Sequence, residues 1–357
     1  MPNLNLMKTY ALLVFLLSLH LTAFAQNDFT LSGTILNENS EPIEAATVFI
    51  DGSTKIFKTD ADGKYVISGL SRGGYHLVVN MIGYGSIKQD VLISDNTLTL
   101  NIKLIAKEQT LKEVVIVGDQ RFKYLNTFRK YFLGESEYAS ACTILNSDII
   151  HFNMKGQILS ANTDDFLVIK NAVLGYKIKY LLRNFQYNTY LETTQYQGQC
   201  IFEEMTGSKL EQDKWRKNRK EAYYGSLMHY LRSLYRGTAQ IEGFVTYKVL
   251  NTRLPIDIDI DPMKSGRLIK QIDESLIEIK YKRRLYTIYN KNLAARNFSF
   301  KKDERIIKEL DEHGSIFKTD GKIDSKGNYI DYTELLVQGF WGRKRIGDQL
   351  PYEYVPE

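Results

Sequence analysis

The sequence predicts an all-β sandwich followed by an α+β domain, and three observations support this prediction. From Phe29 to about Gly118, short apolar runs are separated by turn-forming residues at intervals of about 8–12 residues, which is typical of a small antiparallel sandwich. Beyond this region, amphipathic helical patterns alternate with the period-2 patterns of strands. The chain also contains 24 Tyr and 17 Phe, and aromatic side chains pack well on pleated sheets.

Composition places the chain among ordinary globular proteins. Its 357 residues are 43% hydrophobic and 25% charged, and this length permits about two domains of usual size. The formal net charge of +5 is a mild excess, and such an excess does not by itself indicate a nucleic-acid partner. We therefore expect no nucleic acid to bind.

Residues 1–25 have the features of an export signal. Lys8 supplies a positive charge, residues 11–17 are apolar, and Ala23-Phe24-Ala25 forms a small-x-small cleavage site. The apolar run is too short to cross about 30 Å of hydrocarbon comfortably. We expect an exported protein of the periplasm or outer membrane, with no transmembrane span in the mature chain.

The predicted sandwich covers residues 28–118. Strand patterns occupy residues 30–36, 46–50, 75–80 and 91–104, and polar turns separate them. One turn, Asp60-Ala61-Asp62-Gly63, has some likeness to a calcium-binding loop. The EF-hand pattern requires a Glu at its twelfth position, where this chain has Ser71. A hairpin turn is the simpler interpretation.

Several stretches of this region carry a family resemblance. They are Gly33-Thr34-Ile35, residues 42–48 (PIEAATV), residues 59–65 (TDADGKY), Gly74-Tyr75-His76-Leu77 and Ile82-Gly83-Tyr84. Together they resemble the carboxypeptidase-regulatory-like domain, which is abundant in envelope proteins of Bacteroidetes-type bacteria. The resemblance implies a transthyretin-like sandwich of seven strands.

Residues 111–118 (LKEVVIVG) are similar to the segment that closes the N-terminal extension of TonB-dependent outer-membrane receptors. The rest of the chain is too short for a plug and a barrel of about 22 strands. This resemblance therefore suggests an accessory component of an outer-membrane transport system and not the transporter itself.

Residues 119–357 are predicted to form the α+β domain, with an antiparallel sheet and helices against one face. Residues 120–133 and 208–236 have helical patterns, and Gly237 is expected to end the second helix. Strand patterns occur near residues 176–180, 277–281 and 329–340. No activity is implied by these patterns.

A basic run lies within the second predicted helix: Lys214, Arg216, Lys217, Arg219 and Lys220. One interpretation is the solvated face of an amphipathic helix, with Trp215 packed beneath it. Another is a contact with an anionic glycan or lipopolysaccharide surface, or with an acidic envelope protein.

No motif of a known catalytic class is present. A metallocarboxypeptidase requires His-x-x-Glu, and none of His76, His151, His229 and His313 has an acidic residue three positions later. The sequence also lacks Gly-x-Ser-x-Gly and a nucleotide-binding loop. We therefore expect no catalytic residues, no cofactor and no metal site.

These observations favour a non-enzymatic cell-envelope protein that binds or has a structural role, with the sandwich as an interaction module. The alternatives are the transport accessory described above and a hydrolase whose site is assembled by tertiary structure. Such a hydrolase requires a cleft in which His151 or His229 reaches a carboxylate.

Cys142 and Cys200 are the two cysteines of the chain. Export to an oxidising compartment permits a disulfide between them, and two free thiols are the alternative. Their spacing fits no zinc motif.

Overall fold

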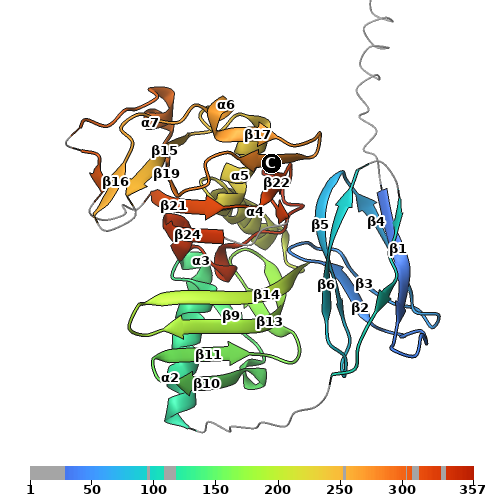
Figure 1. Ribbon diagram of the computed structural model, residues 1–357. Coiled ribbons are helices and arrows are strands. Elements are labelled where there is room, and N and C mark those ends of the chain that lie inside the picture. The colour runs from blue at the N-terminus through green and yellow to red at the C-terminus, as the bar shows by residue number, and fades with distance from the viewer. Residues whose placement is uncertain are drawn as a thin grey trace, which may run out of the picture.

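The fold is described from a computed structural model, which covers residues 29–94, 97–107, 118–251, 255–302, 304–307, 313–330 and 335–357. A β-sandwich stands beside a larger α+β region (Figure 1). The predicted export signal lies outside the described residues, as do positions 111–117 of the receptor-like segment.

The sandwich consists of two four-stranded sheets. One has the order β4-β1-β7, with β8 also paired to β1, and the other has the order β3-β2-β5-β6. Apolar residues from both sheets, such as Leu31, Ile67 and Leu77, are completely buried between them. The strands are β1 Phe29–Leu36, β2 Thr47–Ile50, β3 Ile56–Lys58, β4 Lys64–Leu70, β5 Gly73–Asn80, β6 Ile87–Ile93, β7 Leu98–Thr99 and β8 Ile102–Lys103.

The expected count of seven strands is not confirmed, because the described part of the sandwich has eight. β7 and β8 lie along the same edge of β1, and both run parallel to it. At the break between them, Asn101 Oδ1 accepts a hydrogen bond from the Thr34 N–H (2.9 Å). A Cβ at Gly33 would lie 1.9 Å from the Leu100 carbonyl oxygen. Glycine at position 33 therefore permits the close approach of this edge.

The α+β region begins with a six-stranded antiparallel sheet of order β10-β11-β13-β12-β9, with β14 also paired to β13. α2 continues into a π-helical turn, η2, and together they match the helix predicted for residues 120–133. Phe128 and Phe132 are buried against the sheet, whereas Phe122 is 66% exposed. The elements are α2 Asp119–Phe128, η2 Arg129–Leu133, α3 Glu137–Ser140, β9 Cys142–Ile144, η3 Ser147–Ile149, β10 His151–Lys155, β11 Ile158–Asn162, β12 Leu167–Asn171, β13 Tyr176–Asn188 and β14 Thr193–Glu204.

The helix predicted for residues 208–236 is two helices, α4 Lys209–Tyr223 and α5 Leu227–Arg236. The chain turns at Gly225, which has a φ of 79°, and the Ser226 side chain caps the first turn of α5. The Gly225 carbonyl accepts a hydrogen bond from the Trp341 indole (2.7 Å). Gly237 ends α5 in the left-handed conformation, as predicted.

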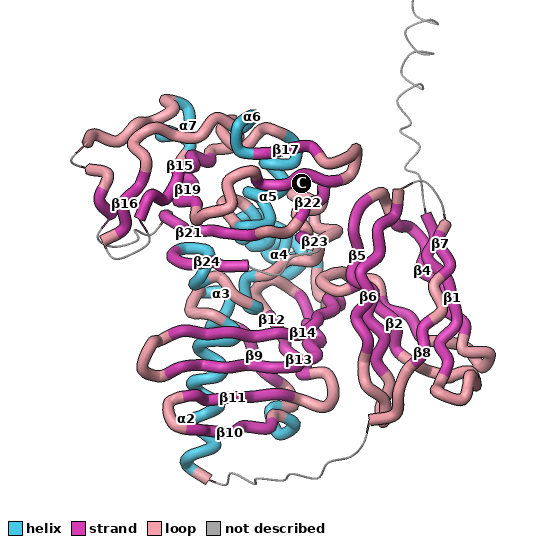
Figure 2. The backbone as a smooth tube through the Cα atoms, viewed as in Figure 1, coloured by secondary structure: helices cyan, strands magenta, loops and turns pink. Residues whose placement is uncertain are grey.

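Two further antiparallel sheets complete the region, with the orders β20-β16-β15-β19-β21-β24 and β17-β18-β22-β23. Strands dominate the described chain, and α4 and α5 lie near its centre (Figure 2). The elements are β15 Phe244–Asn251, β16 Ile256–Ile258, α6 Ser265–Leu268, β17 Ile269–Gln271, β18 Leu276–Ile279, β19 Leu285–Tyr289, α7 Lys291–Ala295, β20 Ile306–Ile307, β21 Gly314–Thr319, β22 Lys322–Asp324, β23 Tyr329–Ile330, β24 Leu335–Gly339, α8 Phe340–Arg343 and η4 Ile346–Asp348.

The C-terminal segment returns to the first sheet of the α+β region. Ile346 and Leu350 belong to the same core cluster as Phe128, and the Asn171 amide donates to the Gly347 carbonyl (2.9 Å). This return joins the parts of the region into one packed body. Among the described helices, none is both long and apolar enough to span a bilayer.

Candidate functional site

The sandwich and the α+β region meet along the outer face of β5. Seven of the eight β5 residues are buried, so the strand is covered on both faces. Leu77 and Val79 face the sandwich core. Val78 and Phe49 form a separate cluster with Ile201 of β14. The α+β region therefore completes the burial of this sheet.

Backbone hydrogen bonds extend the junction along β14. The Gly52 N–H donates to the Cys200 carbonyl, and the Phe202 N–H donates to the Ser53 carbonyl, both at 2.8 Å. Asp51 Oδ1 accepts the Cys200 N–H at 2.7 Å. Burial at the junction raises the pKa of Asp51 to about 6. The turn after β2 thus pairs with β14 as a short strand would.

The turn that joins β22 to β23 covers the outer face of β5. His76 Nε2 lies 2.9 Å from the Tyr329 carbonyl oxygen, and His76 Nδ1 lies 2.6 Å from Asp90 Oδ1. The Lys326 ammonium sits 4.1 Å from the centre of the Tyr75 ring. His76 is therefore held between the two domains, where it has a structural role.

Arg232 of α5 fixes the same turn to the C-terminal segment. Its guanidinium donates to the carbonyls of Lys326 (2.9 Å), Tyr352 (2.9 Å) and Tyr354 (2.7 Å). The Tyr352 N–H in turn donates to the Gly52 carbonyl (2.8 Å). One buried arginine thus connects α5, the β22–β23 turn and the segment that contacts the sandwich.

The basic run of α4 is largely neutralised within the described structure. Arg216 pairs with Asp213, Lys217 approaches Glu221 at 3.9 Å, and Lys220 bonds the backbone oxygen of Glu357. As expected, Trp215 is buried beneath this face, and its indole donates to the Ala172 carbonyl (2.9 Å).

Arg219 departs from the predicted role as a surface cation. It is only 8% exposed, its guanidinium lies 3.8 Å from the centre of the Tyr176 ring, and it donates to the Leu174 carbonyl (2.7 Å). Glu204 pairs with it at 3.1 Å. The prediction that Arg219 contacts an external anionic surface is therefore wrong, because its donors are directed into the protein.

A pocket of about 430 Å³ lies beside the basic run. Arg216, Lys217, Arg219 and Lys220 line it, and so do Glu204, Glu353 and Glu357. These charges nearly cancel. Lys214 does not line this pocket.

Two histidines of the α+β region do reach carboxylates. His151 Nε2 lies 3.1 Å from Asp164 Oδ2 on an exposed surface, and His229 Nε2 lies 2.9 Å from Glu242 Oε2. His229 is 1% exposed and packs against the rings of Tyr223, Tyr224, Phe244 and Tyr289. Burial lowers the pKa of His229. Neither histidine lines the pocket beside the basic run or a second, larger pocket of the α+β region.

Cys142 and Cys200 are free and buried. They lie on β9 and β14, with β12 and β13 between them. Strands are spaced about 4.8 Å apart, so the cysteines are separated by at least roughly 14 Å, whereas a disulfide requires Cα atoms within about 7 Å. Burial raises the pKa of Cys142 to about 12, which keeps its thiol protonated.

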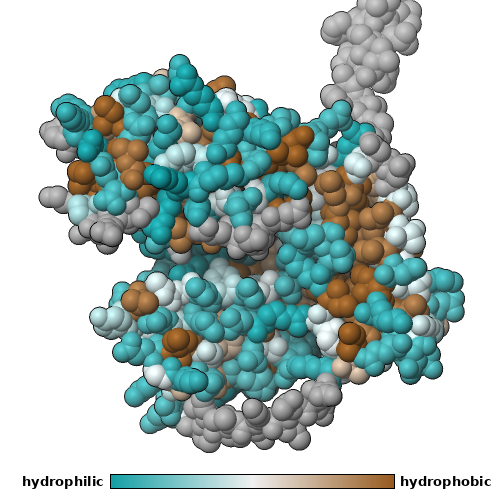
Figure 3. All heavy atoms as spheres, in the orientation of Figure 1, coloured by the Kyte–Doolittle hydropathy of each residue, from teal (hydrophilic) through white to brown (hydrophobic). Residues whose placement is uncertain are grey.

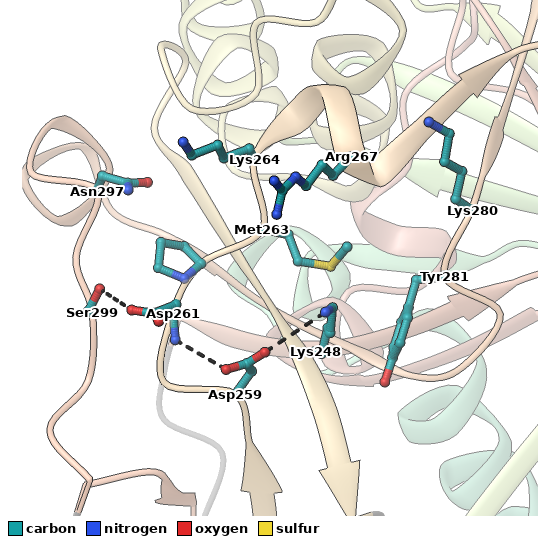
Figure 4. Close-up of a pocket in the computed structure, with 11 residues that line it drawn as sticks. Lys248, Asp259, Asp261, Met263, Lys264, Arg267, Lys280, Tyr281, Asn297 and Ser299 are labelled. Atoms are coloured by element: carbon teal, nitrogen blue, oxygen red, sulfur yellow. Dashed lines mark hydrogen bonds and ion pairs between the residues drawn. The ribbon is translucent and has the colours of Figure 1, made fainter.

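A larger pocket, of about 560 Å³, opens in the α+β region (Figure 4). Its lining comes from β15, the segment that follows β16, the short helix α6, the two residues after β18 and the loop after α7. The residues are Lys248, Asp259, Asp261, Pro262, Met263, Lys264, Arg267, Lys280, Tyr281, Asn297 and Ser299. Four cations face two carboxylates, so this pocket has an excess of positive charge.

The two carboxylates of this larger pocket are held from neighbouring elements. Asp259 lies 4.0 Å from the Lys248 ammonium, and Asp261 Oδ1 accepts the Ser299 hydroxyl (2.9 Å). The Tyr281 hydroxyl donates to the Val249 carbonyl (3.0 Å). This arrangement can bind an anion and hydrogen-bond polar groups beside it.

The sequence alone does not indicate this pocket, because its cations are spread over several separated segments. One local signal was present: isoleucine and aspartate alternate at residues 256–261. That pattern predicts a strand with aspartates on one face, and β16 begins there. It places the carboxylates, but it does not indicate that Arg267 or Lys280 lies near them.

Comparisons with known proteins identify the sandwich. Residues 31–116 match the family model of the CarboxypepD_reg-like domain. TonB-dependent receptor P39 of Formosa agariphila is 32% identical over 121 residues, which are 33% of this chain and 11% of the receptor. The chain thus matches about one ninth of that relative's length.

Similar solved structures include a streptococcal ancillary pilin (12% identity, 24% of this chain and 34% of that chain, TM-score 0.21). Another is catechol 1,2-dioxygenase of Acinetobacter radioresistens (13% identity, 26% and 57%, TM-score 0.21). Likeness at this level supports no conclusion about function. The family match agrees with the resemblance carried by the residues themselves, and the chain therefore contains a CarboxypepD_reg-like domain at residues 31–116.

Proposed function

We propose that this protein is a non-enzymatic, exported component of the cell envelope that acts by binding, with its sandwich as the interaction module. The observation that carries the proposal is the junction at β5, where the outer face of this strand already packs against the α+β region. A module docked in this way leaves its second sheet and its loops available to an external partner.

The rest of the sandwich surface supports this proposal. Figure 3 shows hydrophobic residues gathered on the visible face of the sandwich. Exposed apolar groups of this kind are typical of interaction surfaces. Among the described residues of the sandwich, the large hydrophobic side chains that remain exposed are Val66 (58%), Ile82 (81%), Leu92 (46%), Leu98 (38%) and Ile105 (62%).

The hydrolase alternative is less well supported. His229 has a carboxylate partner, but it is enclosed by aromatic rings. His151 is exposed and does not line either pocket. In the larger pocket, Ser299 donates to Asp261 with no histidine among the lining residues, and a carboxylate alone is a weak base for a serine hydroxyl.

A role beside an outer-membrane receptor remains the second candidate. It is favoured by the relative whose name is TonB-dependent receptor P39. On this proposal, the sandwich of this chain occupies a position next to a receptor barrel, and the α+β region provides the further surface.

Cross-linking in intact envelopes tests both candidates. The mature protein is purified after cross-linking as wild type, Val66→Asp, Ile82→Asp and Leu210→Asp. Leu210 lies on α4 and is 80% exposed, so it is the matched control outside the sandwich.

We expect one envelope protein to be recovered with wild type and Leu210→Asp and to be lost with the sandwich variants. A receptor barrel as that protein supports the transport candidate. Recovery of the chain alone, or equal recovery with every variant, contradicts binding through the sandwich. Turnover of a peptide, ester or glycan that His229→Ala abolishes contradicts the non-enzymatic proposal.

A further inference from the structure

The larger pocket contains cations that the described structure does not neutralise. Lys264 and Arg267 form no ion pair and no side-chain hydrogen bond with any described residue. Among the described residues, the Lys280 ammonium has one hydrogen-bond partner, the Gly266 carbonyl at 3.5 Å. Lys248 is the exception, because Asp259 lies 4.0 Å from it. Like charges gathered in a hollow repel one another, and a bound anion relieves that repulsion.

Arg267 is placed to make the principal contact with such an anion. It projects from α6 toward the open centre of the pocket, between Lys264 and Met263 (Figure 4). A guanidinium offers paired N–H donors that match the oxygens of a carboxylate, sulfate or phosphate. Lys264 projects from the same short segment, so two cations can reach one anionic group.

The rest of the lining suits a ligand that also carries hydroxyl groups. Asp259 and Asp261 accept hydrogen bonds and would repel a bare anion, whereas both can accept from the hydroxyls of a sugar. The Asn297 amide and the Ser299 hydroxyl lie on the same side. Met263 and the ring of Tyr281 provide an apolar surface for the C–H face of a sugar ring.

We propose that this pocket binds an acidic saccharide, a sugar that bears a carboxylate, sulfate or phosphate group. The proposal rests on the binding function proposed above and names a ligand for the α+β region. Arg267 and Lys264 bind the anionic group, and Asp261 accepts a sugar hydroxyl. The pocket beside α4 offers no such site, because glutamates there balance its cations.

The test measures dissociation constants by calorimetry with the mature protein. The ligands are trigalacturonate, a sulfated galactose trisaccharide, the neutral galactose trisaccharide, inorganic phosphate and vesicles containing phosphatidylglycerol. The variants are Arg267→Gln, Asp261→Asn and, as a matched control on α4, Lys214→Gln. Thermal melting verifies that each variant is folded.

We expect at least one acidic trisaccharide to bind, and Arg267→Gln to weaken it about tenfold, the loss of one charge-assisted contact. Lys214→Gln should leave binding unchanged. Asp261→Asn is decisive: it strengthens binding if the site recognises only negative charge, and weakens it if the carboxylate accepts a sugar hydroxyl. We expect weakening.

Three results overturn the inference: no binding of either acidic trisaccharide, equal binding of the neutral one, or binding of phosphate or vesicles as tight as that of the saccharides. Arg267→Gln is also cross-linked in envelopes. If the wild-type protein binds neither acidic trisaccharide but is still recovered with its envelope partner, this inference alone is wrong. If the partner is lost while saccharide binding persists, the sandwich proposal is wrong.

Discussion

Gly74 of the sandwich lies directly against Ile330 of β23: a Cβ at position 74 would be 1.6 Å from Ile330 Cδ1. Contact this close means that a side chain at position 74 would force the Ile330 side chain to move. Glycine 74 therefore permits the β22–β23 turn to cover β5. The junction depends on the absence of atoms at this position as well as on the hydrogen bonds around it.

Gly74→Ala should destabilise the protein by about 1–3 kcal/mol, the usual cost of overpacking a close contact. Urea unfolding measures the change in the free energy of unfolding. Gly85→Ala is the matched control, since a Cβ there meets only the Ile105 carbonyl at 3.7 Å. Ile330→Ala should restore part of the loss in the Gly74→Ala background. Equal effects at positions 74 and 85 would show that the two domains do not dock through this contact.

Asp51 should make the stability of the junction depend on pH. Its pKa is raised from 3.8 to about 6 in the folded protein, so the folded state favours the protonated carboxyl. Protonation therefore stabilises the fold below about pH 4, and this contribution is lost as the pH rises through about 6. The asparagine variant keeps an acceptor for the Cys200 N–H and cannot ionise.

The comparison is made by urea unfolding of wild type and Asp51→Asn at pH 4 and pH 7.5. We expect similar stabilities at the lower pH and a variant more stable by about 1–3 kcal/mol at the higher pH. The opposite sign would mean that the backbone hydrogen bonds to the ionised carboxylate outweigh its burial.

Arg232→Ala should release the C-terminal segment. The substitution leaves three carbonyls, those of Lys326, Tyr352 and Tyr354, without the guanidinium that now bonds them. The cost should be at least about 2 kcal/mol, since unpaired polar groups in a partly buried site are expensive. Hydrogen exchange at the Tyr352 amide, which bonds Gly52, should accelerate. Arg216→Ala, on the solvated face of α4, should leave that exchange unchanged.

Local sequence was sufficient to predict the sandwich, because Gly and Asp residues mark its turns. Gly63 has a φ of 71°, and Asp60 Oδ1 accepts the N–H groups of Asp62 (3.0 Å) and Lys64 (2.8 Å). Such turns are stabilised by neighbouring residues alone. The parallel pairing of β7 and β8 with β1 was not predictable in this way, since it depends on how the chain crosses between sheets.

Features that depend on distant residues were missed for the same reason. The break between α4 and α5 occurs where Trp341 bonds Gly225, and these residues are 116 positions apart. Hydrophobic spacing continued through the break, so the pattern predicted one helix. The charge of the basic run was evident in sequence, but the burial of Arg219 depends on Tyr176 and on carbonyls of a distant turn.

Arg219 and Lys217 provide a direct test, within one helix, of the difference between a buried cation and a solvated one. Both belong to the basic run of α4. Arg219 stacks on Tyr176 and bonds two carbonyls, those of Leu174 and Gly175, whereas the Lys217 side chain is 77% exposed. Arg219→Gln should therefore cost about 2 kcal/mol through lost hydrogen bonds and packing. Lys217→Gln should change stability by less than about 0.5 kcal/mol, as is usual at exposed positions.

The dependence of stability on salt concentration also distinguishes a buried arginine from a surface charge. Stabilisation by a surface charge weakens as ionic strength rises, whereas a buried arginine that bonds carbonyls is screened little. The deficit of Arg219→Gln, measured by urea unfolding, should therefore be nearly the same at 0.05 and 0.5 M sodium chloride. A loss of stability that disappears at the higher salt concentration would show that Arg219 behaves as a residue of the solvated face. All five cations of the run could then contact an external anion.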